Sequence, residues 1–143
     1  MTVARILAEK GRAVVTIEPG RSLDEAIHLL AEKGIGALVV SDDTHPVLGI
    51  VSERDIMRAI SAKGAAALDA RVSAHMTTSV ITCGQGASVE EVMHLMTDNR
   101  FRHVPVVEEG RLVGLISIGD AVKSRIAAVE AEHQAMKDYI TMA

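Results

Sequence analysis

The stretch that decides the fold is "LVGLISIGDAV", Leu112 to Val122, because the chain also contains "VLGIVSERDIM", Val47 to Met57. In both stretches an apolar run that includes a glycine ends at a serine, and an aspartate follows three residues later. An apolar run is typical of a buried β-strand, and Ser-x-x-Asp is typical of the first turn of a helix. The chain therefore contains two copies of one strand-to-helix unit.

The similarity between the two copies extends well beyond this unit. The run "VVTI" at Val14–Ile17 recurs 66 positions later as "VITC" at Val80–Cys83, and "SLDE" from Ser22 recurs as "SVEE" from Ser88 at the same offset. Self-similarity at a fixed offset indicates a tandem repeat. The sequence therefore predicts two related halves.

Each copy predicts the element order β-α-β-β-α. The first helix begins at a Ser-x-x-Glu capping pattern, at Ser22 and Ser88, and the second begins at the Ser-x-x-Asp. Apolar runs predict strands at 14–17, 37–40 and 47–51 in the first copy and at 80–83, 104–107 and 112–116 in the second. We therefore expect an α/β fold with two pseudo-symmetric halves.

Further segments flank and connect the copies. Residues 2–10 and 68–76 predict short lead-in helices, residues 61–70 are expected to link the copies, and residues 120–143 predict one long helix. The domain boundaries that we predict are 1–66 for the first unit with its lead-in helix, 67–128 for the second unit and 129–143 for a C-terminal helical extension.

The long C-terminal helix carries a stripe of mostly apolar residues that are separated by four and three positions. Its members are Val122, Ile126, Val129, His133, Met136 and Ile140. This spacing is typical of a helix–helix seam, but it covers fewer than three heptads, and a helix packed on its own domain explains it as well. Because exposed apolar surface of this kind is usually covered, we expect a homodimer.

Composition and charge narrow the class of protein. Of the 143 residues, 48% are hydrophobic but only two are aromatic, so the core must be aliphatic. The net charge of −4 and the lack of a basic run argue against a nucleic-acid or anionic-membrane partner. One cysteine excludes an internal disulfide, no Cys/His group has zinc spacing, and no secretory signal or membrane-spanning run is present. We expect a cytoplasmic protein.

Ser52 with Asp55 and Ser117 with Asp120 can be interpreted in two ways. Ser-x-x-Asp is itself a helix cap, and this explains one copy without any ligand. Each pair, however, follows an apolar strand, and the free N–H groups of a helix start are a common place for a phosphate or a sugar. A carboxylate at that turn repels phosphate but can accept the two hydroxyls of a ribose. The second interpretation predicts a ribose-bearing ligand.

Arg102 and His103 precede the third strand of the second copy and are candidates for phosphate contacts. An Arg guanidinium matches the geometry of phosphate, although a surface arginine and a packed histidine explain the pair too. The first copy has Gly36 and Ala37 at these positions. The two sites are therefore expected to be unequal.

Signatures of catalysis are missing from the sequence. It contains no nucleophile elbow, no P-loop, no GxGxxG and no HExxH. Cys83 lies in an apolar run, where a buried, inert thiol is expected. We therefore predict that the chain is not an enzyme, with no catalytic residues and no metal ligands.

The doubled, ordered set of motifs resembles the tandem cystathionine β-synthase (CBS) domain, and in particular free-standing bacterial CBS-pair proteins. The similarity covers roughly residues 3 to 128 and rests on "IGALVVSDD", "GIVSERDIMRAI", "HMTTSVIT" and "FRHVPVVEEGRLVGLISIGD". It implies two units packed sheet to sheet, with ligand clefts between them. It also implies binding of AMP, ADP, ATP, NAD(H) or S-adenosylmethionine, commonly in energy sensing.

The resemblance also implies roles for particular residues. The ribose would be held by Asp120, Ser117, Asp55 and Ser52. Adenine slots would be lined by Val80, Ile81, Thr82 and Cys83 and, equivalently, by Val14, Val15, Thr16 and Ile17. Phosphate would be met by Arg102, His103 and Arg54, the last from the neighbouring unit.

These implications lead to one main hypothesis and one alternative. The main hypothesis is a regulatory module that binds an adenosine-containing ligand, needs no cofactor and signals by conformation or by binding an unidentified protein target. The alternative is a dimeric interaction or scaffold protein that does not sense nucleotides.

Overall fold

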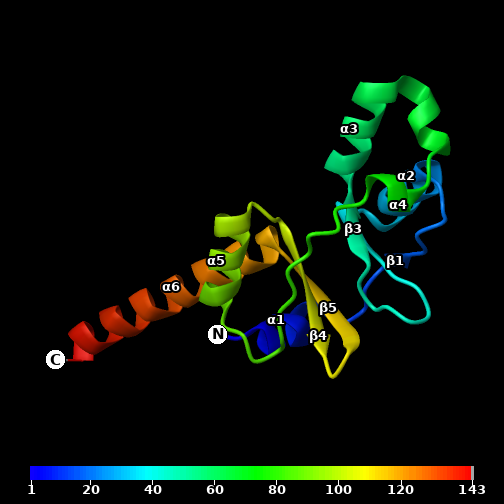
Figure 1. Ribbon diagram of the computed structural model, residues 1–143. Coiled ribbons are helices and arrows are strands. Elements are labelled where there is room, and N and C mark those ends of the chain that lie inside the picture. Colours follow the sequence, from blue (N-terminus) through cyan, green and yellow to red (C-terminus); the bar gives the residue numbers. More distant parts are fainter. Residues whose placement is uncertain (143) are drawn as a thin grey trace. The chain divides into compact units, whose positions relative to one another are not determined.

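The structure is a computed structural model that describes residues 1–142. The chain divides into two compact units (Figure 1). The Asp55 unit consists of Ala13–Ile81 and Glu108–Val113, and the Asp120 unit consists of Met1–Arg12, Thr82–Val107 and the chain from Gly114 onward. Each unit therefore combines segments from both sequence copies.

The Asp55 unit contains a three-stranded sheet with helices packed against it. Its elements are β1 (Thr16–Ile17), α2 (Leu23–Lys33), β2 (Ala37–Val40), β3 (Gly49–Ser52), α3 (Glu53–Lys63), the 3-10 helix η1 (Gly64–Asp69) and α4 (Val72–His75). The strand order is β1-β2-β3. Val39 lies opposite Thr16 in the parallel pair and opposite Ile50 in the antiparallel pair. The predicted β-α-β-β-α order is confirmed in this unit.

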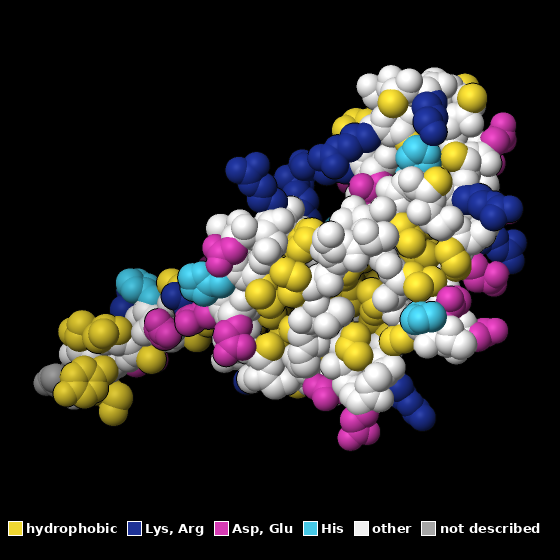
Figure 2. All heavy atoms as spheres, in the orientation of Figure 1, with side chains coloured by type: hydrophobic (Ala, Val, Ile, Leu, Met, Phe, Trp, Pro, Cys, Tyr) yellow, Lys and Arg dark blue, Asp and Glu magenta, His cyan; other side chains and the backbone are white. Residues whose placement is uncertain are grey.

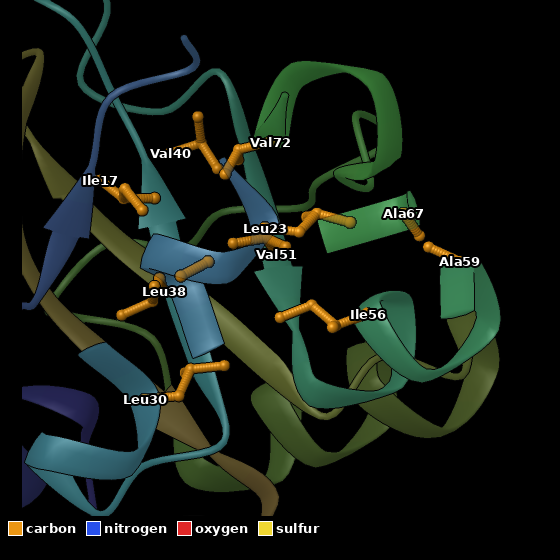
Figure 3. Close-up of a cluster of buried hydrophobic side chains, with 11 residues drawn as sticks. Ile17, Leu23, Leu30, Leu38, Val40, Val51, Ile56, Ala59, Ala67 and Val72 are labelled. Carbon is orange, nitrogen blue, oxygen red and sulfur yellow. The ribbon is translucent and has the colours of Figure 1, made fainter. Parts of the chain in front are cut away.

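The core of the Asp55 unit is aliphatic throughout, as the composition predicts. Its largest fully buried side chains are Leu23, Leu38, Ile56 and several valines from β2, β3 and α4 (Figure 3). Burial of one such side chain stabilises the fold by roughly 1.5–3 kcal/mol. The sheet and its two long helices are therefore held together by aliphatic packing, and this packing fixes the turn between β3 and α3.

The Asp120 unit combines three helices with most of the two strands of a β-hairpin, and the tip of that hairpin, Glu108–Val113, belongs to the Asp55 unit. Its elements are α1 (Val3–Lys10), α5 (Val89–Asn99), β4 (His103–Glu108), β5 (Arg111–Ser117) and α6 (Ile118–Met142). The hairpin turn places Glu109 and Gly110 at φ 48° and 75°. A two-residue turn with both central residues at positive φ matches the twist of the flanking strands. The predicted long C-terminal helix is confirmed, and its last predicted residue, Ala143, lies outside the described residues.

The predicted strands that open each copy are shorter in the structure. In place of 14–17, β1 covers Thr16–Ile17, and in place of 80–83 only Cys83 pairs, parallel to Val106. The chain passes from one compact unit to the other just before each of these strands, after Arg12 and after Ile81. Next to β1, the carbonyl of Val15 still accepts from the N–H of Val39 at 3.3 Å, so the first strand is shortened and the second is reduced to a single bridge.

The lead-in segments are exchanged between the sequence copies. At the start of α1, the N–H groups of Val3 and Ala4 donate to the carbonyls of Ala87 and Gln85, at 2.9 and 3.0 Å. Helix α1 therefore belongs to the Asp120 unit and packs with the second copy.

Helix α4 makes the matching contacts in the Asp55 unit. The N–H groups of Val72 and Ser73 donate to the carbonyls of Arg21 and Pro19, at 2.7 and 3.0 Å. Each compact unit therefore takes its lead-in segment from the other copy. The predicted domain boundaries, which follow the order of the copies in the sequence, stay a prediction; they are 1–66, 67–128 and 129–143.

Candidate ligand site

The Asp120 turn, which we define as Ser117 to Asp120, joins β5 to α6 with a reciprocal pair of hydrogen bonds. The N–H of Asp120 donates to Ser117 Oγ at 3.1 Å, and the N–H of Ser117 donates to Asp120 Oδ2 at 2.9 Å. This is a complete capping box, and it confirms the helix-cap interpretation. Among residues 1–142, no donor contacts the second carboxylate oxygen, Oδ1 of Asp120. The cap therefore leaves one acceptor of this side chain available.

Lys10 also binds the Asp120 carboxylate. Its Nζ lies 2.6 Å from Asp120 Oδ2 and donates to the carbonyl of Leu115 at 2.9 Å. Burial of the Asp120 carboxyl raises its pKa, but the hydrogen bonds from Lys10 and Ser117, together with the charge of Lys10, outweigh burial and hold the pKa below its ordinary value of 3.8. Asp120 is therefore an ionised acceptor with a cation beside it.

The Asp55 turn, Ser52 to Asp55, repeats the capping geometry between β3 and α3. The N–H of Asp55 donates to Ser52 Oγ at 3.3 Å, and the N–H of Ser52 donates to Asp55 Oδ2 at 2.8 Å. Here the additional partner of the carboxylate is a neutral hydroxyl: Thr77 Oγ1 donates to Asp55 Oδ1 at 3.3 Å. The two turns therefore share a cap but differ in what contacts the carboxylate.

The structure brings Arg102 to the Asp120 turn. Its carbonyl accepts a 2.8 Å hydrogen bond from the N–H of Ile118, the first residue of α6, and its side chain is exposed. His103 opens β4 and is half-buried. The predicted phosphate residues thus adjoin the start of α6, although their contact with a phosphate stays a prediction.

The equivalent position in the Asp55 unit is Gly36, which has no charged side chain and lies beside an acidic one. The carbonyl of Gly36 accepts from the N–H of Glu53 at 3.0 Å, and a Cβ at Gly36 would lie 3.5 Å from a Glu53 carboxylate oxygen. An acidic side chain therefore stands near the Asp55 turn where an arginine stands near the Asp120 turn.

The predicted adenine-slot residues are divided between the two compact units. Val80 and Ile81 belong to the Asp55 unit, and Thr82 and Cys83 belong to the Asp120 unit. Cys83 is half-buried rather than buried, and it forms a single parallel bridge with Val106 instead of lying inside a strand. The first-copy set is Val14, Val15, Thr16 and Ile17, of which only Ile17 is buried. The adenine slots, the clefts, the sheet-to-sheet packing of the halves and the reach of the exposed Arg54 all stay predictions.

A hollow of about 500 Å³ lies on the Asp55 unit, beside β1 and α2. Its lining residues are Thr16, Ile17, Glu18, Arg21, Glu25, His28, Leu29, Glu32 and Ser41. It includes two predicted adenine-slot residues but neither Ser52 nor Asp55. This hollow therefore does not coincide with the Asp55 turn.

Across residues 1–142, no helix is both long enough and apolar enough to cross a membrane. Within the same residues, no group of three or more His, Cys, Asp or Glu side chains is arranged to hold a metal ion.

Sequence reasoning missed Lys10 and Thr77. Each lies far from its aspartate in the sequence, 110 and 22 residues away respectively. Both contacts result from the exchange of lead-in segments between the copies. That exchange is not visible in the repeat pattern, which assigns each lead-in to the copy that follows it.

Comparison with known proteins identifies the family. The family model of the CBS domain matches residues 5–62 and 72–126. The chain therefore belongs to the CBS domain family and contains two tandem CBS domains, as the sequence motifs predict.

Solved structures of CBS-domain proteins superpose on most of the chain. The CBS-domain containing protein ATU1752 from Agrobacterium tumefaciens is 48% identical, with a TM-score of 0.83 over 87% of this chain and 92% of that one. Two other similar structures were solved with ligands. The CBS domain pair of protein MJ0100 is in complex with 5-methylthioadenosine and S-adenosyl-L-methionine (26% identity, TM-score 0.77, 91% and 98% covered). CBSX2 is in complex with AMP (25% identity, TM-score 0.74, 88% and 97% covered).

Curated relatives include both stand-alone proteins and an enzyme. The mitochondrial CBS domain-containing protein CBSX3 of Arabidopsis thaliana is 30% identical over 147 residues, and the match covers 97% of this chain and 71% of the relative. Inosine-5'-monophosphate dehydrogenase of Methanocaldococcus jannaschii is 33% identical over 113 residues. The match covers 78% of this chain but only 22% of that enzyme. CBS domains thus occur in enzymes as well as alone.

Proposed function

We propose that this chain is a regulatory module that binds an adenosine-containing ligand at the Asp120 turn and, with a different preference, at the Asp55 turn. The observation that carries the proposal is the carboxylate of Asp120. It is held in place by the cap, keeps one oxygen without a partner among the described residues, and lies at the start of a 25-residue helix. The complexes of two similar CBS pairs with adenosine-containing compounds support this choice of ligand.

The chemistry of the turn suits a ribose. Its vicinal hydroxyls are donors, and an ionised carboxylate accepts such hydrogen bonds with a strength of about 1.5–3 kcal/mol. Ser117 holds the carboxylate in place, and the start of α6 presents backbone N–H groups. Arg102 adjoins the same helix start and would contact a phosphate attached to the ribose.

The ligands that fit this proposal are AMP, ADP, ATP, NAD(H) and S-adenosylmethionine, each bound as a signal rather than as a cofactor. No residue of the chain is assigned a catalytic role. The output is a change of conformation or the binding of a protein target, as expected for an energy sensor in the cytoplasm.

A thermal-shift screen tests the proposal. The chain is melted alone and with AMP, ATP, NADH or S-adenosylmethionine. A ligand at 100 times its Kd should stabilise the folded chain by about 2.7 kcal/mol and raise the melting temperature by several degrees. Guanosine monophosphate has the same ribose and phosphate as AMP, so it is the matched control for recognition of the adenine base. No shift with any adenosine compound at millimolar concentration would remove the proposal.

A second candidate function, a dimeric interaction protein, is favoured by the surface of α6. Of its residues up to Met142, Ala121 alone is buried. The stripe residues Ile126, Met136 and Ile140 are 53%, 62% and 65% exposed, and Figure 2 shows hydrophobic side chains gathered on the last turns of α6. A second copy that pairs its stripe with this one would cover these side chains.

Light scattering tests this candidate. A homodimer should give twice the chain mass of 15.2 kDa at micromolar concentration. Ile126→Glu places a charge in the stripe and should yield a monomer, whereas Ala127→Glu, on an exposed position next to the stripe, should not. A monomeric wild-type chain would exclude the dimer and leave nucleotide binding unaffected.

A further inference from the structure

Lys10 is held in a defined position rather than extended into solvent. It is the last residue of α1, whose first turn is fixed by hydrogen bonds to the carbonyls of Ala87 and Gln85. Leu7 is fully buried, and a Cβ at Gly114 would lie 2.5 Å from its Cδ2 atom, so the middle of α1 lies directly against β5. The helix therefore delivers the Lys10 ammonium to the carbonyl of Leu115 and to Asp120 Oδ2.

The other lead-in segment makes the same packing contact and then diverges. Met76 lies against Gly49 as Leu7 lies against Gly114, but α4 ends at His75 and Met76 is extended, with φ −64° and ψ 154°. The next residue, Thr77, pairs with Ile50 through two backbone hydrogen bonds of 3.0 and 2.8 Å. Its hydroxyl, and not an ammonium, therefore contacts Asp55.

The partner changes the net charge of each turn. At the Asp120 turn the carboxylate is paired with Lys10, and the exposed Arg102 adds a positive charge. At the Asp55 turn the carboxylate is paired with a neutral hydroxyl, and the charges of Glu53 and the exposed Arg54 within the turn offset each other. Because negative side chains repel a phosphate and positive ones attract it, the two turns favour ligands of different charge.

We propose that Lys10 makes the Asp120 turn selective for adenosine ligands that carry phosphate. This inference rests on the proposed function and names the ligand class of one of its two sites. Lys10 cancels the repulsion between Asp120 and a phosphate, and its ammonium has a third hydrogen available for a phosphate oxygen. The Asp55 turn, which has no cation bound to its carboxylate and carries a net negative charge from Glu53, Arg54 and Asp55, takes neutral or cationic adenosyl compounds.

Lys10 also competes with the ribose, since a hydroxyl that donates to Asp120 Oδ2 must share that oxygen with the ammonium. This competition weakens adenosine and AMP equally, because both contain the same ribose. The ratio of the two affinities therefore isolates the effect of Lys10 on the phosphate.

Nuclear magnetic resonance titration measures this ratio at the site itself. The amide signal of Gly119, the second residue of α6, is followed while AMP or adenosine is added to the wild type and to Lys10→Met. Lys33→Met is the matched control, because Lys33 is likewise the last residue of a helix that is followed by a glycine, but it lies in the Asp55 unit.

The wild type should bind AMP more tightly than adenosine, and Lys10→Met should lose at least about tenfold of that preference, the size that one hydrogen bond to a charged group can produce. Lys33→Met should keep the preference. Lys10→Arg should also keep it and Lys10→Gln should lose it, so the conclusion does not depend on the folding of one variant.

Two outcomes would overturn the proposal in distinguishable ways. If AMP and adenosine bind but their ratio is the same in the wild type and in Lys10→Met, Lys10 does not select for phosphate, and the proposed function stands. If neither compound shifts the Gly119 signal in any variant, the proposed function fails, and the role of Lys10 fails with it.

Discussion

The Asp120 turn and the Asp55 turn have the same cap and different chemistry. In both, a serine and an aspartate exchange hydrogen bonds across a strand-to-helix junction. The residue that reaches the carboxylate from the lead-in segment differs, Lys10 in one and Thr77 in the other. Local geometry is therefore shared by the copies, whereas the charge of each site depends on a segment that comes from the other copy.

This difference originates in the backbone conformation of the two lead-in segments. Both lead-in segments pack on a glycine of the strand that precedes the turn, Leu7 on Gly114 and Met76 on Gly49. After that contact α1 stays helical for three more residues, whereas the chain after Met76 becomes extended and pairs with β3. A change of local backbone conformation in the lead-in thus changes the partner of the aspartate.

The largest expected effect distinguishes the two glycine contacts. In Gly49→Ala the new Cβ would lie 2.6 Å from the backbone oxygen of Thr77, which is held by pairing with Ile50. In Gly114→Ala the three atoms nearest to the new Cβ all belong to the side chain of Leu7, which can rotate in part. We expect Gly49→Ala to lower the free energy of unfolding by about 2–3 kcal/mol and Gly114→Ala by about 1–2 kcal/mol.

Urea denaturation measures both losses. Gly20→Ala is the control, because a Cβ there has no heavy atom within 4 Å, so its effect should be close to zero. Equal losses at Gly49 and Gly114 would show that both lead-in segments move equally easily to make room for a Cβ. The proposed difference between the rigid Thr77 contact and the adjustable Leu7 contact would then be wrong.

The next effect concerns ligand binding at the two aspartates. Asp120→Ala should weaken AMP binding at the Gly119 amide by at least about tenfold, because it removes a charged acceptor of the ribose hydroxyls. Asp55→Ala should leave that affinity unchanged, since Asp55 belongs to the other unit. Loss of either cap should also lower the free energy of unfolding, by about 0.5–2 kcal/mol.

Two controls separate ribose binding from capping. Asp98→Ala removes an exposed acidic residue of α5 and should change neither affinity nor stability by more than a small amount. In the wild type, 2′-deoxy-AMP should bind at least about tenfold more weakly than AMP. If the two nucleotides bind equally, Asp120 is a helix cap and not a ribose acceptor.

The cap, the repeat and the aliphatic core could be predicted because each depends on residues that are close together in the sequence. Ser117 and Asp120 are three positions apart, and the alternation of apolar runs and capping residues fixes the element order. The predicted strand at 80–83 failed for the opposite reason. Its residues have a high strand propensity, but most of the segment connects two compact units and has no partner strand, so tertiary context overrides propensity.

The charge of the candidate site could not be predicted from the same pattern. The contact between Lys10 and Asp120 spans 110 residues and depends on which copy receives α1. The repeat pattern indicates the opposite assignment, because a lead-in helix stands next to its own copy in the sequence. The roles of the residues in the adenine slot depend on a bound ligand and stay predictions for the same physical reason: they follow from tertiary placement and not from local pattern.

The smallest expected effect is the pH dependence of the Lys10–Asp120 ion pair. Because the pKa of Asp120 in the folded chain lies below its ordinary value of 3.8, the folded state favours the ionised carboxylate. The pair therefore contributes its full stability above pH 3.8, and the contribution is lost as the pH falls through the lowered pKa. Lys10 is 38% exposed and the Asp120 side chain 23%, so the contribution should be about 1 kcal/mol or less.

The comparison of the wild type with Lys10→Met isolates this contribution, because every other carboxylate titrates in both proteins. The difference between their free energies of unfolding, from urea denaturation, should be constant between pH 7 and pH 5 and should shrink as the pH falls below 3.8. Carboxyl carbon shifts of Asp120 should give a lower pKa in the wild type than in Lys10→Met. The Asp55 turn supplies the contrast, since Thr77→Val removes a neutral donor and should produce a difference with much less dependence on pH. A wild-type minus Lys10→Met difference that stays unchanged down to pH 3 would mean that the ammonium does not stabilise the ionised carboxylate, and the electrostatic contrast between the two turns would then rest on Arg102 and Glu53 alone.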